Sequence, residues 1–163
     1  MADDWQARVD AVWHDDALSD EERIERIDAI ARERDAHDPT ALFERAGARD
    51  AAGSEAEAEP LYRAALEQGL DDERRPQAVI QLASTLRNLD RVDEATGLLR
   101  AEVDRVPVSP LRDEAAAFLA LALASSGDGR EAASVALLAL APHLRRYTRS
   151  VSAYARELVG TES

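Results

Sequence analysis

Apolar residues recur along the chain at spacings of three and four, which places them on one face of an α-helix. At the start, "WQARVDAVWHD" and "DEERIERIDAIARERD" both have this pattern and predict two amphipathic helices, the second beginning at Ser19 or Asp20. Three further helix pairs follow, and a closing helix at 142–159 carries its apolar residues on one face: Leu144, Tyr147, Val151, Tyr154 and Leu158. The pattern predicts an all-α chain of about nine helices.

The same arrangement of small residues returns every 37 residues. Alanines mark one position in the second helix of each pair (Ala58, Ala95, Ala132) and one in the first helix (Ala46, Ala83, Ala120), with turn residues between them (Gly53, Asp90, Gly127). Three registers that share one period indicate a repeat protein. Alanine suits these positions because a small side chain lets the two helices of a pair approach closely.

Local signals mark the helix ends of the first repeat. Asp38 with Pro39 predicts the start of its first helix. Ser54 with Glu57 predicts a capping box at the start of its second helix. Pro60 lies near that start, where the loss of one backbone hydrogen bond is tolerated.

The repeated positions resemble the tetratricopeptide repeat family. The matching residues are Leu42, Ala46, Gly53, Ala58, Tyr62 and Ala65 in the first repeat, Val79, Leu82, Ala83, Leu86, Ala95, Leu99 and Pro107 in the second, and Leu119, Ala120, Leu123, Gly127, Ala132 and Ala139 in the third. The family's usual period is about 34 residues, so the longer period here suggests lengthened loops. The whole chain is also similar to a bacterial group of stand-alone proteins of this family. The resemblance implies antiparallel helix pairs stacked into a right-handed superhelix (an α-α solenoid), whose first helices line a concave groove that usually binds peptides.

We expect a single domain over residues 1–163. Its parts are a helical pair or degenerate repeat at 1–37, repeats at 38–70, 71–107 and 108–141, and a capping helix at 142–160. Trp5 and Val9 lie 37 residues before Leu42 and Ala46, which favours the degenerate repeat. A stacked array requires end units of this kind, with a polar outer side.

One helix carries the candidate binding residues. Within 77–88, an uncharged polar stripe lies beside the apolar packing stripe and consists of Gln77, Gln81, Ser84 and Asn88, with Arg87 next to it. Amides both donate to and accept from an extended peptide backbone, and arginine can bind a carboxylate with two hydrogen bonds. In the family resemblance this stripe faces the groove. The alternative is an ordinary solvated helix face.

Phe43 and Phe118 occupy first helices of their repeats at similar register. They are candidate apolar anchors for a bound segment, and the alternative is that both belong to the core. The helix at 115–126 is apolar on nearly all sides, which indicates burial on more than one side.

Composition narrows the function. The net charge of −13 argues against binding to nucleic-acid backbones. No apolar run is long enough to cross a membrane, and the acidic start does not resemble a signal peptide, so a cytoplasmic protein is expected. The chain has no cysteine, its three histidines are dispersed, and no phosphate-binding loop or nucleophile motif occurs. We therefore expect no enzyme activity, no cofactor and no metal.

The favoured function is a protein-interaction module that binds a peptide or partner segment in the groove. The alternative is a self-assembling homo-oligomer, for which a homodimer through the chain ends is one arrangement. Residues 1–40 carry thirteen acids and five arginines, whereas the closing helix carries Arg145, Arg149 and Arg156 along one line. For those arginines, a solvated face is the competing interpretation.

Overall fold

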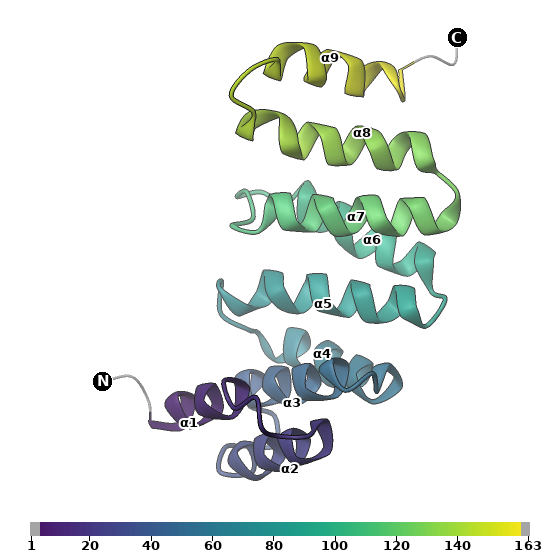
Figure 1. Ribbon diagram of the computed structural model, residues 1–163. Helices are drawn as coiled ribbons and strands as arrows, with labels where there is room; N and C mark the ends of the chain where they lie inside the picture. Colours follow the sequence, from purple (N-terminus) through teal and green to yellow (C-terminus); the bar gives the residue numbers. More distant parts are fainter. Residues whose placement is uncertain (1–3, 161–163) are drawn as a thin grey trace. The chain divides into compact units, whose positions relative to one another are not determined.

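The computed structural model describes residues 4–160, and the outermost residues of the predicted domain, 1–3 and 161–163, lie outside the described residues. The described part is helical, without strands (Figure 1). Its elements are α1 (Asp4–Trp13), α2 (Asp20–Ala31), α3 (Pro39–Ala51), α4 (Glu55–Gln68), α5 (Arg74–Asn88), α6 (Val92–Val103), α7 (Arg112–Ser126), α8 (Gly129–Leu140), the short 3-10 helix η1 (Ala141–His143) and α9 (Thr148–Glu157). The predicted all-α fold of about nine helices is confirmed, since residues 4–160 form nine α-helices.

The chain forms two compact units, which divide between Thr85 and Leu86 near the end of α5. In the first unit, α2 packs against both α1 and α3, and α3 packs against α4. In the second unit, α7 packs against both α6 and α8, and α8 packs against α9. Within each of the two units, most of the packed helices are therefore consecutive in the sequence (Figure 1).

The turn inside each predicted repeat has the same backbone geometry. Gly53, Asp90 and Gly127 all adopt left-handed conformations, with φ of 73°, 61° and 93°. In each turn the next residue donates its N–H to the carbonyl five residues back: Ser54 to Arg49 (2.8 Å), Arg91 to Leu86 (2.9 Å) and Asp128 to Leu123 (2.9 Å). This is the Schellman ending of a helix, and its recurrence every 37 residues confirms the repeat.

The alanines of the other two registers are buried. They are Ala46, Ala83 and Ala120 in the first helices and Ala58, Ala95 and Ala132 in the second helices. A buried methyl group adds little bulk between two helix axes, so these positions permit the close packing that the spacing predicted. Helix α7 is buried on several sides, as expected, because it packs between α6 and α8.

The first two helices form the predicted amphipathic pair. Trp5 and Val9 pack with Ile27 and Ala31 in a core that also includes residues of α3. The Trp5 indole Nε1 donates to the Ile30 carbonyl at 2.9 Å. Helix α2 begins with a complete capping box, in which Ser19 and Glu22 bond each other's backbone N–H groups.

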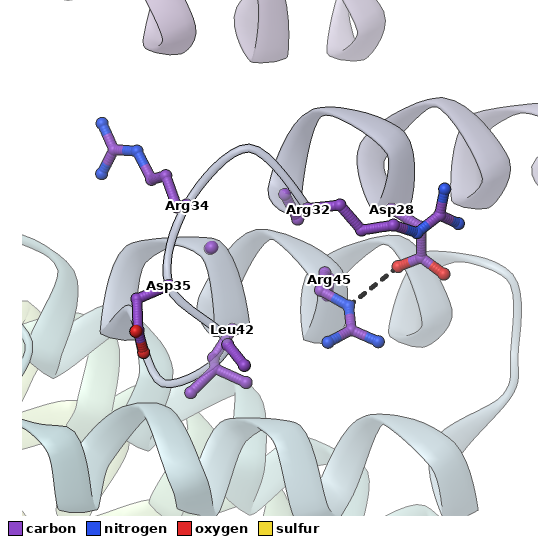
Figure 2. Close-up of a pocket in the computed structure, with 9 residues that line it drawn as sticks. Asp28, Arg32, Arg34, Asp35, Leu42 and Arg45 are labelled. Atoms are coloured by element: carbon purple, nitrogen blue, oxygen red, sulfur yellow. Dashed lines mark hydrogen bonds and ion pairs between the residues drawn. The ribbon is translucent and has the colours of Figure 1, made fainter.

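An ion-pair cluster joins α2 to α3. Asp28 accepts hydrogen bonds from Arg45 Nε at 2.9 Å and from both terminal nitrogens of Arg49, at 2.8 and 3.1 Å. Figure 2 shows the Arg45–Asp28 bond beside the turn that carries Arg32, Arg34 and Asp35. Burial acts to raise the pKa of Asp28, but the bonds from Arg49 and Arg45 outweigh it and hold this pKa below the ordinary aspartate value.

The capping box predicted for Ser54 and Glu57 is wrong. Ser54 precedes α4, but its side chain makes no capping hydrogen bond. The reason is that the Ser54 N–H already closes the turn that ends α3, which fixes the backbone of this residue. Glu57 instead pairs with Arg49, with 3.4 Å between Oε2 and Nε. Helix α4 runs through Pro60 without interruption.

The single closing helix predicted for 142–159 is also wrong. The chain forms η1, turns extended at Leu144 and begins α9 only at Thr148, after Tyr147 in a left-handed conformation. Because the helix is broken, the five apolar residues do not share one buried face. Tyr147 and Tyr154 are 74% and 65% exposed, and Ala155 is the residue of α9 that is buried. Within residues 4–160, no helix is both long and apolar enough to span a lipid bilayer.

The same substitution is expected to have opposite effects at two glycines of the second unit. Gly97 lies inside α6 with open space around its Cα, so Gly97→Ala should raise the free energy of unfolding by about 1 kcal/mol. Gly127 has φ of +93°, so Gly127→Ala should lower the free energy of unfolding by about 1–2 kcal/mol. Urea denaturation followed by circular dichroism measures both changes, and a shift of the same sign in the two variants would contradict the assigned turn.

Candidate functional site

A hollow of about 430 Å³ lies in the first unit between α1, α3 and α5, and we call it the α3 hollow. These are the first helices of three successive pairs. The lining residues are Trp13 from α1, Phe43, Glu44, Gly47, Asp50 and Ala51 from α3, and Gln77 and Gln81 from α5. The structure thus brings together three of the predicted binding residues, Phe43, Gln77 and Gln81.

The remaining predicted residues do not line this hollow. Ser84 is half-buried on α5, one turn beyond Gln81. Arg87 and Asn88 at the end of α5 and Phe118 in α7 belong to the second unit. Their role in binding stays a prediction.

The two amides on α5 have different surroundings. Gln77 donates from Nε2 to the Glu73 carbonyl at 3.1 Å, one turn back on its own helix. The side-chain oxygen of Gln81 is buried and meets no hydrogen-bond donor within residues 4–160. An unsatisfied buried acceptor costs about 1–3 kcal/mol, so the free protein carries this cost at Gln81.

Aromatic side chains form two walls of the α3 hollow. Phe43 is 8% exposed and lies against Tyr62, with ring centroids 6.2 Å apart, so it is a core residue as well as part of the wall. Trp13 lies against Gly47, where an added Cβ would be 3.4 Å from the indole Cζ2. Glycine at this position therefore lets the indole come close to the α3 backbone.

Glu44 is the most deeply buried acid of the α3 hollow, at 7% exposure. The Trp13 Nε1 donates to its Oε2 at 2.8 Å, and Gln6 also hydrogen-bonds its carboxyl. Burial nevertheless raises the pKa of Glu44 above its ordinary value, although both bonds and the charge of Arg74 act in the opposite direction.

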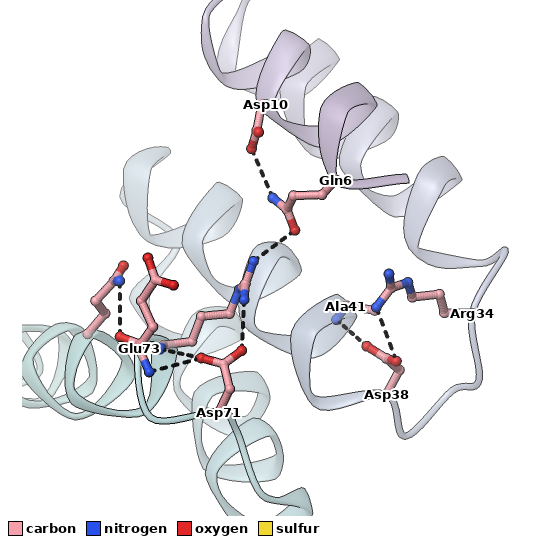
Figure 3. A network of polar contacts seen from close by, with 9 residues as sticks. Gln6, Asp10, Arg34, Asp38, Ala41, Asp71 and Glu73 are labelled. Carbon is pink, nitrogen blue, oxygen red and sulfur yellow. Dashed lines mark hydrogen bonds and ion pairs between the residues drawn. The ribbon is translucent and has the colours of Figure 1, made fainter. Parts of the chain in front are cut away.

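A chain of polar contacts continues from Gln6. Its amide donates to Asp10 at 2.9 Å and accepts from Arg74 at 3.0 Å, and Arg74 in turn bonds Asp71 at 2.7 Å (Figure 3). Arg74 is thereby held by groups outside the α3 hollow and is not among the lining residues.

Asp50 joins three helices at the other side of the α3 hollow. Its Oδ2 accepts from the hydroxyl of Tyr62 in α4 at 3.2 Å, and its Oδ1 from the hydroxyl of Thr85 in α5 at 3.1 Å. The Thr85 hydroxyl also lies 2.9 Å from the backbone carbonyl of Gln81, so its one proton is shared between that carbonyl and Asp50 Oδ1. Burial raises the pKa of Asp50 above its ordinary value, against the effect of both hydrogen bonds, and burial with the nearby Asp50 charge raises the pKa of Tyr62.

The sequence alone missed five lining residues: Trp13, Glu44, Gly47, Asp50 and Ala51. One signal was present, because an isolated glycine inside a helical pattern often marks a close approach by another element. Gly47 is such a residue. Within the described part of the chain, no group of three or more acids and histidines is placed to hold a metal ion.

Comparison with known families identifies the family of this chain. The model of the family described as Tetratrico peptide repeat matches residues 39–158, which include α3 to α9. The chain belongs to this family. Its repeats generally mediate protein–protein interactions. The α1–α2 pair precedes the match, and the narrower resemblance to a bacterial group stays a prediction.

No curated protein and no solved structure gives a match to this tetratricopeptide repeat chain.

The shared carboxyl of Asp50 predicts coupled losses of stability. Tyr62→Phe and Thr85→Val each remove one donor, so each should lower the free energy of unfolding by about 1 kcal/mol. The double variant leaves Asp50 without either donor, so its loss should exceed the sum of the two by at least about 0.5 kcal/mol. A double-mutant cycle in urea measures this coupling, and strictly additive losses would contradict a shared acceptor.

Glu44 predicts a pH-dependent stability difference. Because its pKa is raised in the folded state, Glu44 contributes stability below the unfolded value of 4.5, and this contribution is lost as pH rises through the folded pKa. Glu44→Gln lacks this loss. The free energy of unfolding of Glu44→Gln, measured relative to that of the parent protein, should therefore increase as pH rises from about 4 to about 7.

Glu131→Gln provides the control for this prediction. Arg100 hydrogen-bonds Glu131 and lowers its pKa, so the stabilisation by Glu131 is lost as pH falls. Urea denaturation at several pH values should thus show that the free energy of unfolding of Glu131→Gln decreases relative to that of the parent as pH rises. Equal pH profiles for Glu44→Gln and the parent would contradict the burial of an ionisable carboxyl.

Proposed function

We propose that this chain is a non-enzymatic interaction module that binds an extended segment of a partner protein in the α3 hollow. The family supports the class of function, since its repeats generally mediate protein–protein interactions. The position of the hollow on α1, α3 and α5 supports the site, because the resemblance implies that first helices line the groove.

The observation that carries the proposal is the buried, unpartnered oxygen of Gln81. An extended peptide backbone presents N–H donors that a folded protein otherwise satisfies internally. A bound segment that donates to Gln81 recovers a hydrogen bond that the free protein lacks. Gln77, at the preceding turn of α5, lines the same hollow and offers a further amide for a second backbone contact.

Selection of peptides from a displayed random library on the full chain tests this function. Peptides that bind should lose about tenfold or more in affinity on Gln81→Leu, because the acceptor is removed while the side-chain volume is kept. Gln68→Leu is the matched control, since Gln68 is exposed at the end of α4 and outside the hollow. Fluorescence polarisation with synthetic peptides measures both affinities.

Failure to select any peptide would contradict the proposed function, and so would equal effects of the two glutamine substitutions. Sedimentation of the same preparation at low and high salt addresses the alternative of self-assembly. Salt-dependent dimers without peptide binding would favour that alternative.

A further inference from the structure

We propose that the α3 hollow receives a basic side chain, lysine or arginine, from the bound segment. This inference rests on the proposed function and adds the chemistry that the partner must present. It follows from the groups that surround the hollow, from its walls and from the charge of the first unit.

The charged groups that line the α3 hollow are both carboxyls, those of Glu44 and Asp50 from α3. Gln81 lines the hollow from α5, and its side-chain oxygen is buried without a donor among the described residues. Among the described residues, none that lines the hollow is basic. Lysine offers three donors and arginine five, and neither has an acceptor, so a basic head group matches this set of partners.

The walls suit the rest of such a side chain. Trp13 and Phe43 are aromatic, and Gly47 and Ala51 leave room beside them. Lysine and arginine have apolar stems that pack on apolar surface while the charged head reaches polar groups. A short acceptor-lined hollow with aromatic walls therefore fits a basic side chain better than an acidic or a purely apolar one.

Most of the net negative charge lies in the first unit, which contains the hollow. Residues 1–85 carry 22 acids and ten arginines, a net charge of −12, whereas residues 86–163 carry 11 acids and ten arginines, a net charge of −1. A negative field of this kind raises the association rate of a basic partner segment and repels an acidic one.

Among the described contacts, the acids of the α3 hollow have no arginine that donates a hydrogen bond to them. The charge of Arg74 influences Glu44, but the Arg74 side chain is hydrogen-bonded to Asp71 and Gln6. Asp10 and Tyr62 are the other titratable groups near Glu44, while Tyr62 and Glu55 are those near Asp50. Burial raises the pKa of both acids, so a cation that enters the hollow lowers these pKa values and binds more tightly as pH rises.

The experiment uses peptides selected on the full chain. They should share one basic position, and replacing that residue by the neutral isostere norleucine should weaken binding about tenfold or more. Exchange of lysine for arginine at the same position identifies the preferred head group. The affinity of the basic peptide should also rise between about pH 5 and about pH 7, while that of the norleucine peptide stays constant.

Variants of the protein locate the effect. Glu44→Gln and Asp50→Asn should each reduce the preference for the basic peptide over its norleucine form by about fivefold or more. Asp72→Asn removes the same charge at an exposed position outside the hollow, and this preference should then change by less than about twofold.

Two outcomes separate this inference from the proposed function. Peptides that bind and respond to Gln81→Leu, but share no basic residue or tolerate norleucine, would overturn the basic side chain and leave the binding site intact. If no peptide binds, the proposed function fails and the inference fails with it.

Discussion

Three helices of the first unit meet at one partly buried carboxyl, that of Asp50. It accepts from Tyr62 in α4 and Thr85 in α5, so a single side chain of α3 connects three successive helices. The Thr85 hydroxyl also donates to the backbone carbonyl of Gln81, one turn back on α5. The backbone of Gln81 is therefore linked to Asp50 through Thr85. Because a buried acceptor without donors is costly, the three helices keep the spacing at which these bonds form.

In the first unit, the positions of the arginines determine which acids have a lowered pKa and which have a raised pKa. Asp28 and Asp50 are both partly buried, but Asp28 receives Arg45 and two bonds from Arg49, and its pKa is lowered. Asp50 receives neutral hydroxyl groups alone among the described contacts, and its pKa is raised. The two aspartates thus have different roles. Asp28 forms an ion pair between α2 and α3, whereas the charge of Asp50 at the hollow is not neutralised by a base within the described part of the chain. Departures of this kind from the most stable arrangement are typical of binding sites.

Local and repeated features could be predicted from the sequence. Gly53, Asp90 and Gly127 were found because each turn is specified by a few adjacent residues, and Gln77 and Gln81 because helical spacing alone places them on one face. Trp13, Glu44 and Asp50 could not be found, since their role depends on which helix packs against α3. Two local predictions failed for physical reasons. Ser54 serves the end of α3 instead of capping α4, and the break at Tyr147 lies where neither glycine nor proline marks it.

The repeated positions and the hollow use different residues, and this separation explains how the fold accommodates an incompletely satisfied site. Buried alanines and left-handed turns recur in the three repeats, and these features define each helix pair. Of the lining residues, none belongs to these three registers. The unsatisfied oxygen of Gln81 and the raised pKa values of Glu44 and Asp50 therefore lower the stability of the first unit without removing the interactions that define the repeat. In the proposed function, a partner segment that supplies donors to these groups would recover that stability on binding, so that recognition would be coupled to the order of α1, α3 and α5.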